Sequence, residues 1–153
     1  QRAPLLRLYT IENRDYFIDE DGIIFWTQSP NKVYTLVVNG YISIAPLKGG
    51  TIAMIDTIKN AELLRNIYDL AIMIRENKFL DALIDQIYIT KDSEIELIPK
   101  VGRQVIQFGG FKYMLEKLEN LDNFYRQGIK DAGWRKYKTI NLKFKDQIVC
   151  SKI

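Results

Sequence analysis

The sequence predicts an α+β domain in which an antiparallel β-sheet carries two main helices on one face. Several short segments alternate apolar and polar residues, as half-buried strands do, and two longer segments repeat apolar residues every three or four positions, as amphipathic helices do. The chain has 153 residues, of which 47% are hydrophobic and 27% are charged. This length and balance are typical of an ordinary folded protein with a buried core.

The N-terminal part of the chain is rich in strand patterns. Four apolar runs predict strands here, at residues 5–9, 16–19, 23–25 and 33–38. Between the second and third runs, Asp21-Gly22 favours a hairpin, because glycine adopts a positive φ without a steric penalty.

Two segments show the periodicity of helices. The first helix is expected over residues 60–77, with Asn60 as its N-cap and an apolar face formed by Leu63, Ile67, Leu70 and Ile74. The second is expected over residues 111–127, with Gly128 as the residue that ends it and an apolar face formed by Met114, Leu118, Leu121 and Tyr125. Each helix therefore has one face that can pack on the sheet.

Between the two helices, residues 87–108 predict a three-stranded antiparallel meander that both helices cover. Glutamates alternate with aliphatic residues in its middle strand. Ile95 and Leu97 are expected in the core, and Glu94 and Glu96 are expected to face water.

The clearest alternation in the sequence lies near its C-terminus, at residues 139–145, and predicts a terminal strand at an edge of the sheet. This strand is expected to face the core with Ile140, Leu142 and Phe144 and the opposite side with Asn141, Lys143 and Lys145. A partner can add its own strand to such an edge, but lysines on an edge also protect it from indiscriminate pairing. A docking strand and a guarded edge without a partner both fit this pattern.

Composition argues against most catalytic classes. The sequence contains no histidine, which removes the usual imidazole base, the histidine-dependent nucleophile systems and the commonest transition-metal ligand. Its single cysteine, Cys150, excludes an intrachain disulfide and a clustered-thiolate metal site, and is expected to pack as a small hydrophobic residue. We therefore predict a binding protein with no catalytic residue, no cofactor and no metal.

The charge pattern and the apolar runs bear on the partners. The net charge is +3 and both signs are spread along the chain, which does not indicate a nucleic-acid footprint. The apolar runs are far shorter than the roughly 20 residues that a membrane helix needs. The opening residues contain no signal-like segment, so we expect a piece of a longer protein, and an anchor upstream remains open.

Two other functions also remain open from the residues alone. The first is an enzyme or small-ligand domain that uses the carboxylates of Asp19, Glu20 and Asp21, although three acids before a glycine are more typical of a solvated turn. The second is a single-strand nucleic-acid binder that uses the lysines and aromatic residues at 134–145. A concave pocket with convergent polar groups would favour an enzyme, whereas an exposed strand edge would favour a protein-binding module.

A resemblance to a known family is carried by five short segments, at residues 7–9, 16–22, 77–80, 94–102 and 133–144. In their order and spacing they are similar to the extracytoplasmic part of the bacterial cell-division family FtsQ (DivIB), in its Bacteroidetes type. The resemblance implies an FtsQ-type β domain at residues 10–153. It also implies that residues 1–9 are the last strand of a POTRA domain that is otherwise missing from this chain.

The same resemblance implies a function and a location. Members of the family are non-enzymatic scaffolds of the divisome that bind FtsB, together with FtsL, and help to regulate septal peptidoglycan synthesis. They carry one transmembrane helix upstream of these domains. The resemblance therefore implies that this part lies in the periplasm, attached to the inner membrane.

The resemblance further implies that FtsB adds a strand to the terminal strand, with a basic and an aromatic residue at the positions matched here by Lys143 and Phe144. The expected partner-binding residues are Thr139, Asn141, Lys143, Phe144, Lys145, Gln147 and Val149.

Overall fold

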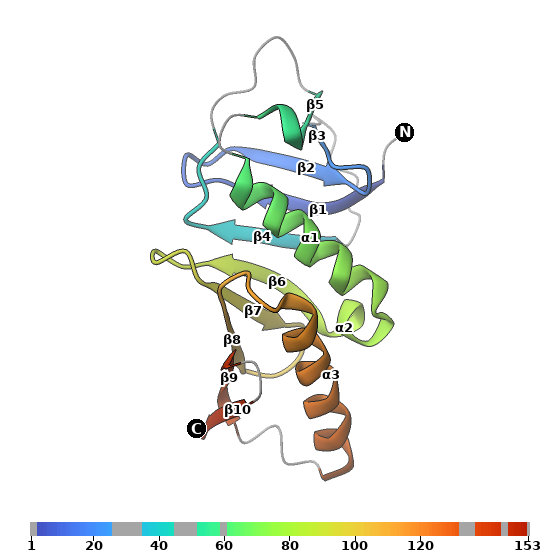
Figure 1. Cartoon of the computed structure of the whole chain (residues 1–153), viewed down its shortest axis with the longest axis vertical. Coiled ribbons are helices and arrows are strands. Elements are labelled where there is room, and N and C mark those ends of the chain that lie inside the picture. The colour runs from blue at the N-terminus through green and yellow to red at the C-terminus, as the bar shows by residue number, and fades with distance from the viewer. Residues whose placement is uncertain are drawn as a thin grey trace.

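Ten strands among the described residues form one continuous sheet (Figure 1). The computed structural model describes residues 3–25, 35–44, 52–58, 61–131, 137–144 and 147–152. The strands are β1 (Pro4–Tyr9), β2 (Asp15–Asp19), β3 (Ile23–Phe25), β4 (Leu36–Gly40), β5 (Ile52–Met54), β6 (Ile84–Ile89), β7 (Ile95–Pro99), β8 (Val105–Gly109), β9 (Tyr137–Phe144) and β10 (Gln147–Lys152). The helices are η1 (Ile55–Thr57), α1 (Glu62–Glu76), α2 (Lys78–Leu83) and α3 (Met114–Asp131). The order across the sheet is β10-β9-β8-β7-β6-β4-β1-β2-β3-β5.

The sheet is mixed, so the prediction of an antiparallel sheet is wrong, although the α+β class is confirmed. β4 pairs in parallel with both β1 and β6, and β8 pairs in parallel with β9. The connections explain two of these pairs. α1 and α2 lie between β4 and β6, and α3 lies between β8 and β9. A helical crossover of this kind brings the next strand back in the same direction.

The strands predicted for the N-terminal part are present. β1, β2 and β3 pair antiparallel in sequence, and β2 and β3 are joined by the hairpin expected at Asp21-Gly22, where Gly22 has a φ of 77°. The buried carboxylate of Asp19 accepts hydrogen bonds from the backbone N–H groups of Asp21 (2.9 Å) and Ile23 (3.0 Å), which holds the turn. β4 covers the second half of the strand predicted at 33–38, whose first two residues lie outside the described residues.

The meander predicted for residues 87–108 is confirmed. β6, β7 and β8 follow one another along the chain and pair antiparallel. Ile95 and Leu97 are buried, whereas Glu94 and Glu96 are half-exposed. The alternation determines this register, because a shift by one residue would bury both glutamates.

The two predicted helices are present, and their details differ. The buried residues of α1 are Leu64, Ile67, Leu70, Ala71 and Ile74. Leu63, which was expected on this face, is half-buried on its flank, because the 3.6-residue period centres the face on its neighbour. The expected N-cap, Asn60, lies outside the described residues. A short helix, α2, follows α1 and was not predicted; the side chain of Asn77 caps it by accepting a hydrogen bond from the N–H of Leu80.

α3 begins later than predicted and ends later. It starts at Met114, because Tyr113 adopts a positive φ of 58° and the chain turns there. It continues through Gly128 to Asp131, so the prediction that Gly128 ends the helix is wrong. A glycine ends a helix only where its own backbone leaves the helical conformation. The predicted core residues Leu118, Leu121 and Tyr125 are buried, and Met114 is half-buried.

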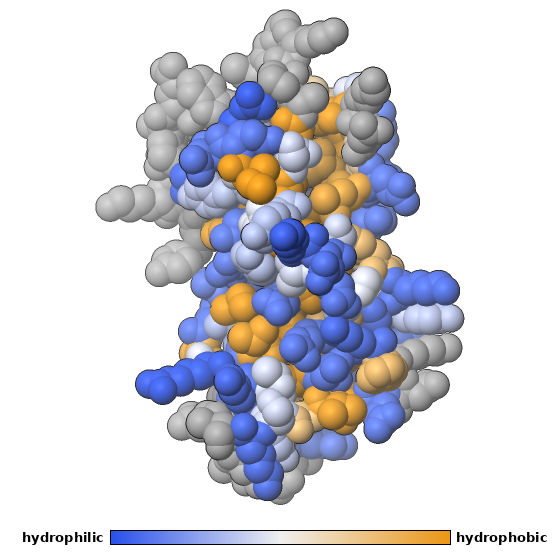
Figure 2. All heavy atoms as spheres, turned by 90° about the vertical axis from the view of Figure 1, so that its left-hand side faces the viewer, coloured by the Kyte–Doolittle hydropathy of each residue, from blue (hydrophilic) through white to orange (hydrophobic). Residues whose placement is uncertain are grey.

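One cluster of buried apolar side chains joins the helices to the sheet. It contains Ile67 of α1, Leu80 of α2 and Leu121 of α3, together with Ile87 and Ile106 of the meander. On the face of the molecule drawn in Figure 2, apolar side chains lie in several separate groups among hydrophilic ones. No described helix is long and apolar enough to span a bilayer.

Candidate functional site

The two C-terminal strands form an antiparallel pair at one end of the sheet, and β10 is the edge strand. The prediction that residues 139–145 form the edge is therefore wrong, because β9 lies between β8 and β10. A second strand folds back along β9 and covers the side that would otherwise be open. Within β10, Ile148 and Cys150 pack against the core, whereas Gln147, Val149 and Ser151 are exposed.

Two of the predicted partner-binding residues use their side chains inside this hairpin. The hydroxyl groups of Thr139 and Ser151 share a hydrogen bond across β9 and β10. The side-chain oxygen of Asn141 accepts a hydrogen bond of 2.9 Å from the backbone N–H of Lys143. Thr139 and Asn141 are both half-buried, so they help to hold the shape of the strand pair.

Lys143 extends across the sheet, away from β10. Its ammonium nitrogen lies 3.2 Å from a carboxylate oxygen of Glu94, which precedes β7. The register of β9 with β10 shifts just after the pair Phe144–Gln147, and a bulge of this kind re-aims neighbouring side chains. Gly109, at the end of β8, has a φ of 84° and leaves room for the lysine stem, since a Cβ there would lie 3.0 Å from Cγ of Lys143.

Glu94 is a residue of this site that sequence reasoning missed. The pattern of the strand predicts correctly that its side chain reaches the surface, and gives it no partner. Glu94 and Lys143 are 49 positions apart in the sequence, and only the order of β7, β8 and β9 in the sheet brings them together. No local signal in one sequence could have shown this pair.

Phe144 does not anchor β9 in the core as predicted, because it is 58% exposed. Ile140 and Leu142 are buried, as expected. The pairing of β9 with β8 ends at Asn141, and the register shift toward β10 interrupts the alternation beyond that point. Phe144 is therefore an exposed aromatic residue at the end of its strand.

Two of the remaining predicted residues, Gln147 and Val149, lie on the edge strand. Gln147 is exposed, Val149 is 44% exposed, and Lys145 lies outside the described residues. The residues described in β8, β9 and β10 include Lys138, Lys143 and Lys152 and no acidic residue. The described residues of these three strands therefore make this end of the sheet basic.

α3 supports the basic end of the sheet through a buried lysine. Lys117 is 3% exposed, and its ammonium donates hydrogen bonds to the backbone oxygens of Phe108 (3.0 Å) and Gly110 (2.9 Å). The same nitrogen lies 4.7 Å from the centre of the Phe108 ring, a cation–π contact. Burial lowers the pKa of Lys117 below its usual value of 10.5, and it raises the pKa values of the Tyr125 hydroxyl and the Cys150 thiol.

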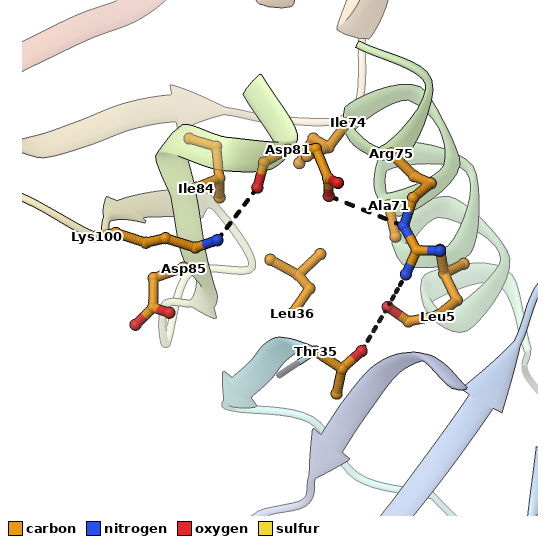
Figure 3. A pocket seen from close by; sticks show the side chains of 10 residues that line it. All are labelled: Leu5, Thr35, Leu36, Ala71, Ile74, Arg75, Asp81, Ile84, Asp85 and Lys100. Carbon is orange, nitrogen blue, oxygen red and sulfur yellow. Dashed lines mark hydrogen bonds and ion pairs between the residues drawn. The ribbon is translucent and has the colours of Figure 1, made fainter. Parts of the chain in front are cut away.

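A cavity of about 270 Å³ lies in another part of the molecule (Figure 3). Its lining residues are Leu5, Thr35, Leu36, Ala71, Ile74, Arg75, Asp81, Ile84, Asp85 and Lys100. Arg75 approaches the Asp81 carboxylate at 3.8 Å, and Lys100 donates to the backbone oxygen of Asp81 at 3.4 Å. The hydroxyl of Thr35 donates to the backbone oxygen of Leu5 at 2.9 Å. Most polar groups around this cavity are thus engaged with one another or with the main chain.

The acidic turn that suggested an enzyme contributes no residue to the lining of this cavity. Asp19 holds the hairpin between β2 and β3, and Glu20 forms an ion pair with Arg75 at 3.0 Å. Among the described residues, no group of three or more histidine, cysteine, aspartate or glutamate side chains could hold a metal ion. The geometry of the turn is that of a structural hairpin.

The fold and the edge strand together define an α+β domain whose sheet, in the part of the chain that the structure describes, ends in an edge strand of six residues, a class suited to binding an extended segment of a partner. A family model described as FtsQ/DivIB, C-terminal related, matches residues 3–151, and the chain belongs to this family. The resemblance seen in the sequence is thereby confirmed. The family is generally one of non-enzymatic scaffolds, and membership implies a role in the divisome. A comparison with curated protein sequences gives no match.

Proposed function

We propose that this chain is the extracytoplasmic part of a divisome scaffold that binds an FtsB-type protein, together with FtsL, by accepting a strand of the partner on β10. Through this contact it helps to regulate septal peptidoglycan synthesis. The intact protein carries one transmembrane helix upstream, and this part lies in the periplasm. Residues 1–9 correspond to the end of a POTRA domain and residues 10–153 to the β domain, and both parts contribute strands to one sheet.

The observation that carries this proposal is the open edge of β10. The strand has six residues and, among the described strands, is bonded to β9 alone. Along an edge of this kind, every second residue directs its backbone N–H and C=O groups outward, where an extended segment can bond to them. The family membership points to a partner of the divisome, and the edge supplies the means of binding it.

The side chains around the edge support the same mode of binding. Val149 on β10 and Phe144 at the end of β9 are exposed apolar side chains that a docked strand could cover. The apolar groups visible in Figure 2 are separate from one another, so that face does not offer one broad apolar patch. Main-chain pairing with a few side-chain contacts is the mode of binding that these exposed residues support.

Amide hydrogen exchange followed by NMR tests the proposal. The probe is the extracytoplasmic segment of the FtsB protein encoded by the same genome. In the free domain, the outward N–H groups of β10 should exchange quickly, and adding the segment should slow their exchange at least tenfold. Strand β5, at the opposite edge of the same sheet, is the internal control and should not change.

Two results would contradict the proposal. The first is the absence of any binding of the segment at concentrations near 1 mM, a range that still detects very weak complexes. The second is binding that slows exchange elsewhere in the domain and leaves the β10 amides as they were.

A further inference from the structure

The ion pair between Lys143 and Glu94 engages a lysine of β9, the strand next to the proposed docking edge. Lys143 is on β9, the neighbour of the edge strand, and its side chain crosses the end of β8 to reach Glu94. This direction is opposite to that of β10. In the free domain the ammonium of Lys143 therefore faces a carboxylate of its own chain.

The charges around the edge indicate the chemistry of the segment that fits it. The described residues of the three strands at this end carry lysines and no acid, so their own contribution to the local potential is positive. An extended segment with carboxylates would be attracted to this end, whereas a basic segment would be repelled. Glu94 is the acidic residue that the structure places in an ion pair with one of these lysines.

We propose that Glu94 is an internal competitor for the partner: it holds Lys143 away from the edge, and an acidic strand docking on β10 must displace it. This inference rests on the proposed function and adds to it a residue that limits affinity. The side chains of Lys143 and Glu94 are 38% and 41% exposed, so both can rearrange without unfolding the domain.

A second lysine stabilises the Glu94 carboxylate when its ion pair with Lys143 is broken. The buried ammonium of Lys117 interacts electrostatically with Glu94 and so gives this carboxylate another positive neighbour. When Lys143 turns toward a partner, Glu94 therefore remains near a positive charge. Docking of the partner therefore breaks one exposed ion pair. The loss of such a pair changes the dissociation constant of the partner by at most about fivefold.

The test compares two Glu→Gln substitutions on the same face of the strand. Glu94→Gln removes the competitor. Glu96→Gln removes the next glutamate on the same side of β7, which has the same charge and similar exposure and forms no ion pair with any described residue. Binding of the FtsB segment is measured by calorimetry at low and at high salt, and thermal unfolding confirms that both variants are folded.

We expect Glu94→Gln to tighten binding about two- to fivefold at low salt, and Glu96→Gln to tighten it clearly less. The difference should shrink at high salt, because exposed charges are screened. In a Lys143→Gln background, Glu94→Gln should give no more than the effect of Glu96→Gln, since the pair no longer exists.

The failures of the two proposals are distinguishable. If neither the wild-type domain nor any variant binds the segment, the proposed function is wrong, and so is the role assigned to Glu94. If the wild type binds at β10 and Glu94→Gln matches Glu96→Gln, or if the gain persists without Lys143, only the role assigned to Glu94 is wrong.

Discussion

The two edges of the sheet differ in ways that bear on binding. β10 has six residues and carries the exposed Val149, whereas β5 has three residues, Ile52–Met54, and is followed at once by the turn of η1. A short edge strand leaves few backbone groups for another chain, and this is a common protection against unwanted pairing. The same sheet therefore ends in one short edge and one edge long enough to receive a strand.

The helices support the two edges differently. α3 contacts β9, the neighbour of the β10 edge, whereas α1 contacts β1 and η1 near the β5 edge. α3 therefore packs against the strand to which β10 is bonded. The following predictions test whether the support from α3 and the exposed groups of β10 distinguish the β10 edge from the β5 edge.

The largest effect should come from removing the apolar support of α3. Leu121→Ala creates a cavity at a fully buried position and should lower the free energy of unfolding by about 2–5 kcal/mol. Amides of β9 and β10 should lose more protection than those of β5 in hydrogen exchange. Leu115→Ala, on the same helix at a position 53% exposed, is the control and should change stability by less than about 0.5 kcal/mol. If the two variants lost the same free energy of unfolding, the packing of α3 through Leu121 would be contradicted.

An intermediate effect should come from the buried lysine of α3. Lys117→Met leaves the backbone oxygens of Phe108 and Gly110 without this donor and should cost about 1–3 kcal/mol, as measured by denaturant unfolding at neutral pH. Lys112→Met, on an exposed residue nearby, is the control.

The cost of Lys117→Met should also depend on pH. The pKa of Lys117 is lower in the folded state than its usual value of 10.5, because the ammonium is buried. Between those two pKa values the unfolded chain binds more protons than the folded one, so the stability of the wild type rises with pH in that window. The difference between wild type and Lys117→Met should therefore widen as the pH approaches 10.5. A difference that stays constant or narrows would show that Lys117 is not desolvated.

The smallest effect on stability should come from the exposed apolar residues of the two edges. Val149 on β10 and Met54 on β5 are exposed to nearly the same extent, 44% and 45%. Val149→Ser and Met54→Ser should each change stability by less than about 0.5 kcal/mol. Only Val149→Ser should weaken binding of the FtsB segment, by about three- to fivefold, because only this side chain becomes covered. A similar loss of affinity in both variants would remove the distinction between the edges.

Local patterns were sufficient for much of this fold. The hairpin at Asp21-Gly22, the meander with Ile95 and Leu97 inside, and the buried face of α3 all depend on neighbours within a few residues, and all are present. The sequence also showed the alternation of β9 and the lack of histidine. These features are short-range or compositional, so one sequence contains them.

The rest depended on which segments meet in three dimensions. The parallel directions of β6 and β9 followed from helical crossovers, and the edge followed from β10 folding back over β9, neither of which periodicity reports. Phe144 is exposed because the pairing of β9 with β8 stops before it, and Glu94 meets Lys143 because two strands separate them in the sheet and 49 positions separate them in the chain. By itself, the sequence determined which faces of the strands and helices are apolar, because burial of apolar side chains requires a regular local pattern. Only the tertiary structure decided which strand is the edge and which charges meet there, because these depend on contacts between distant parts of the chain.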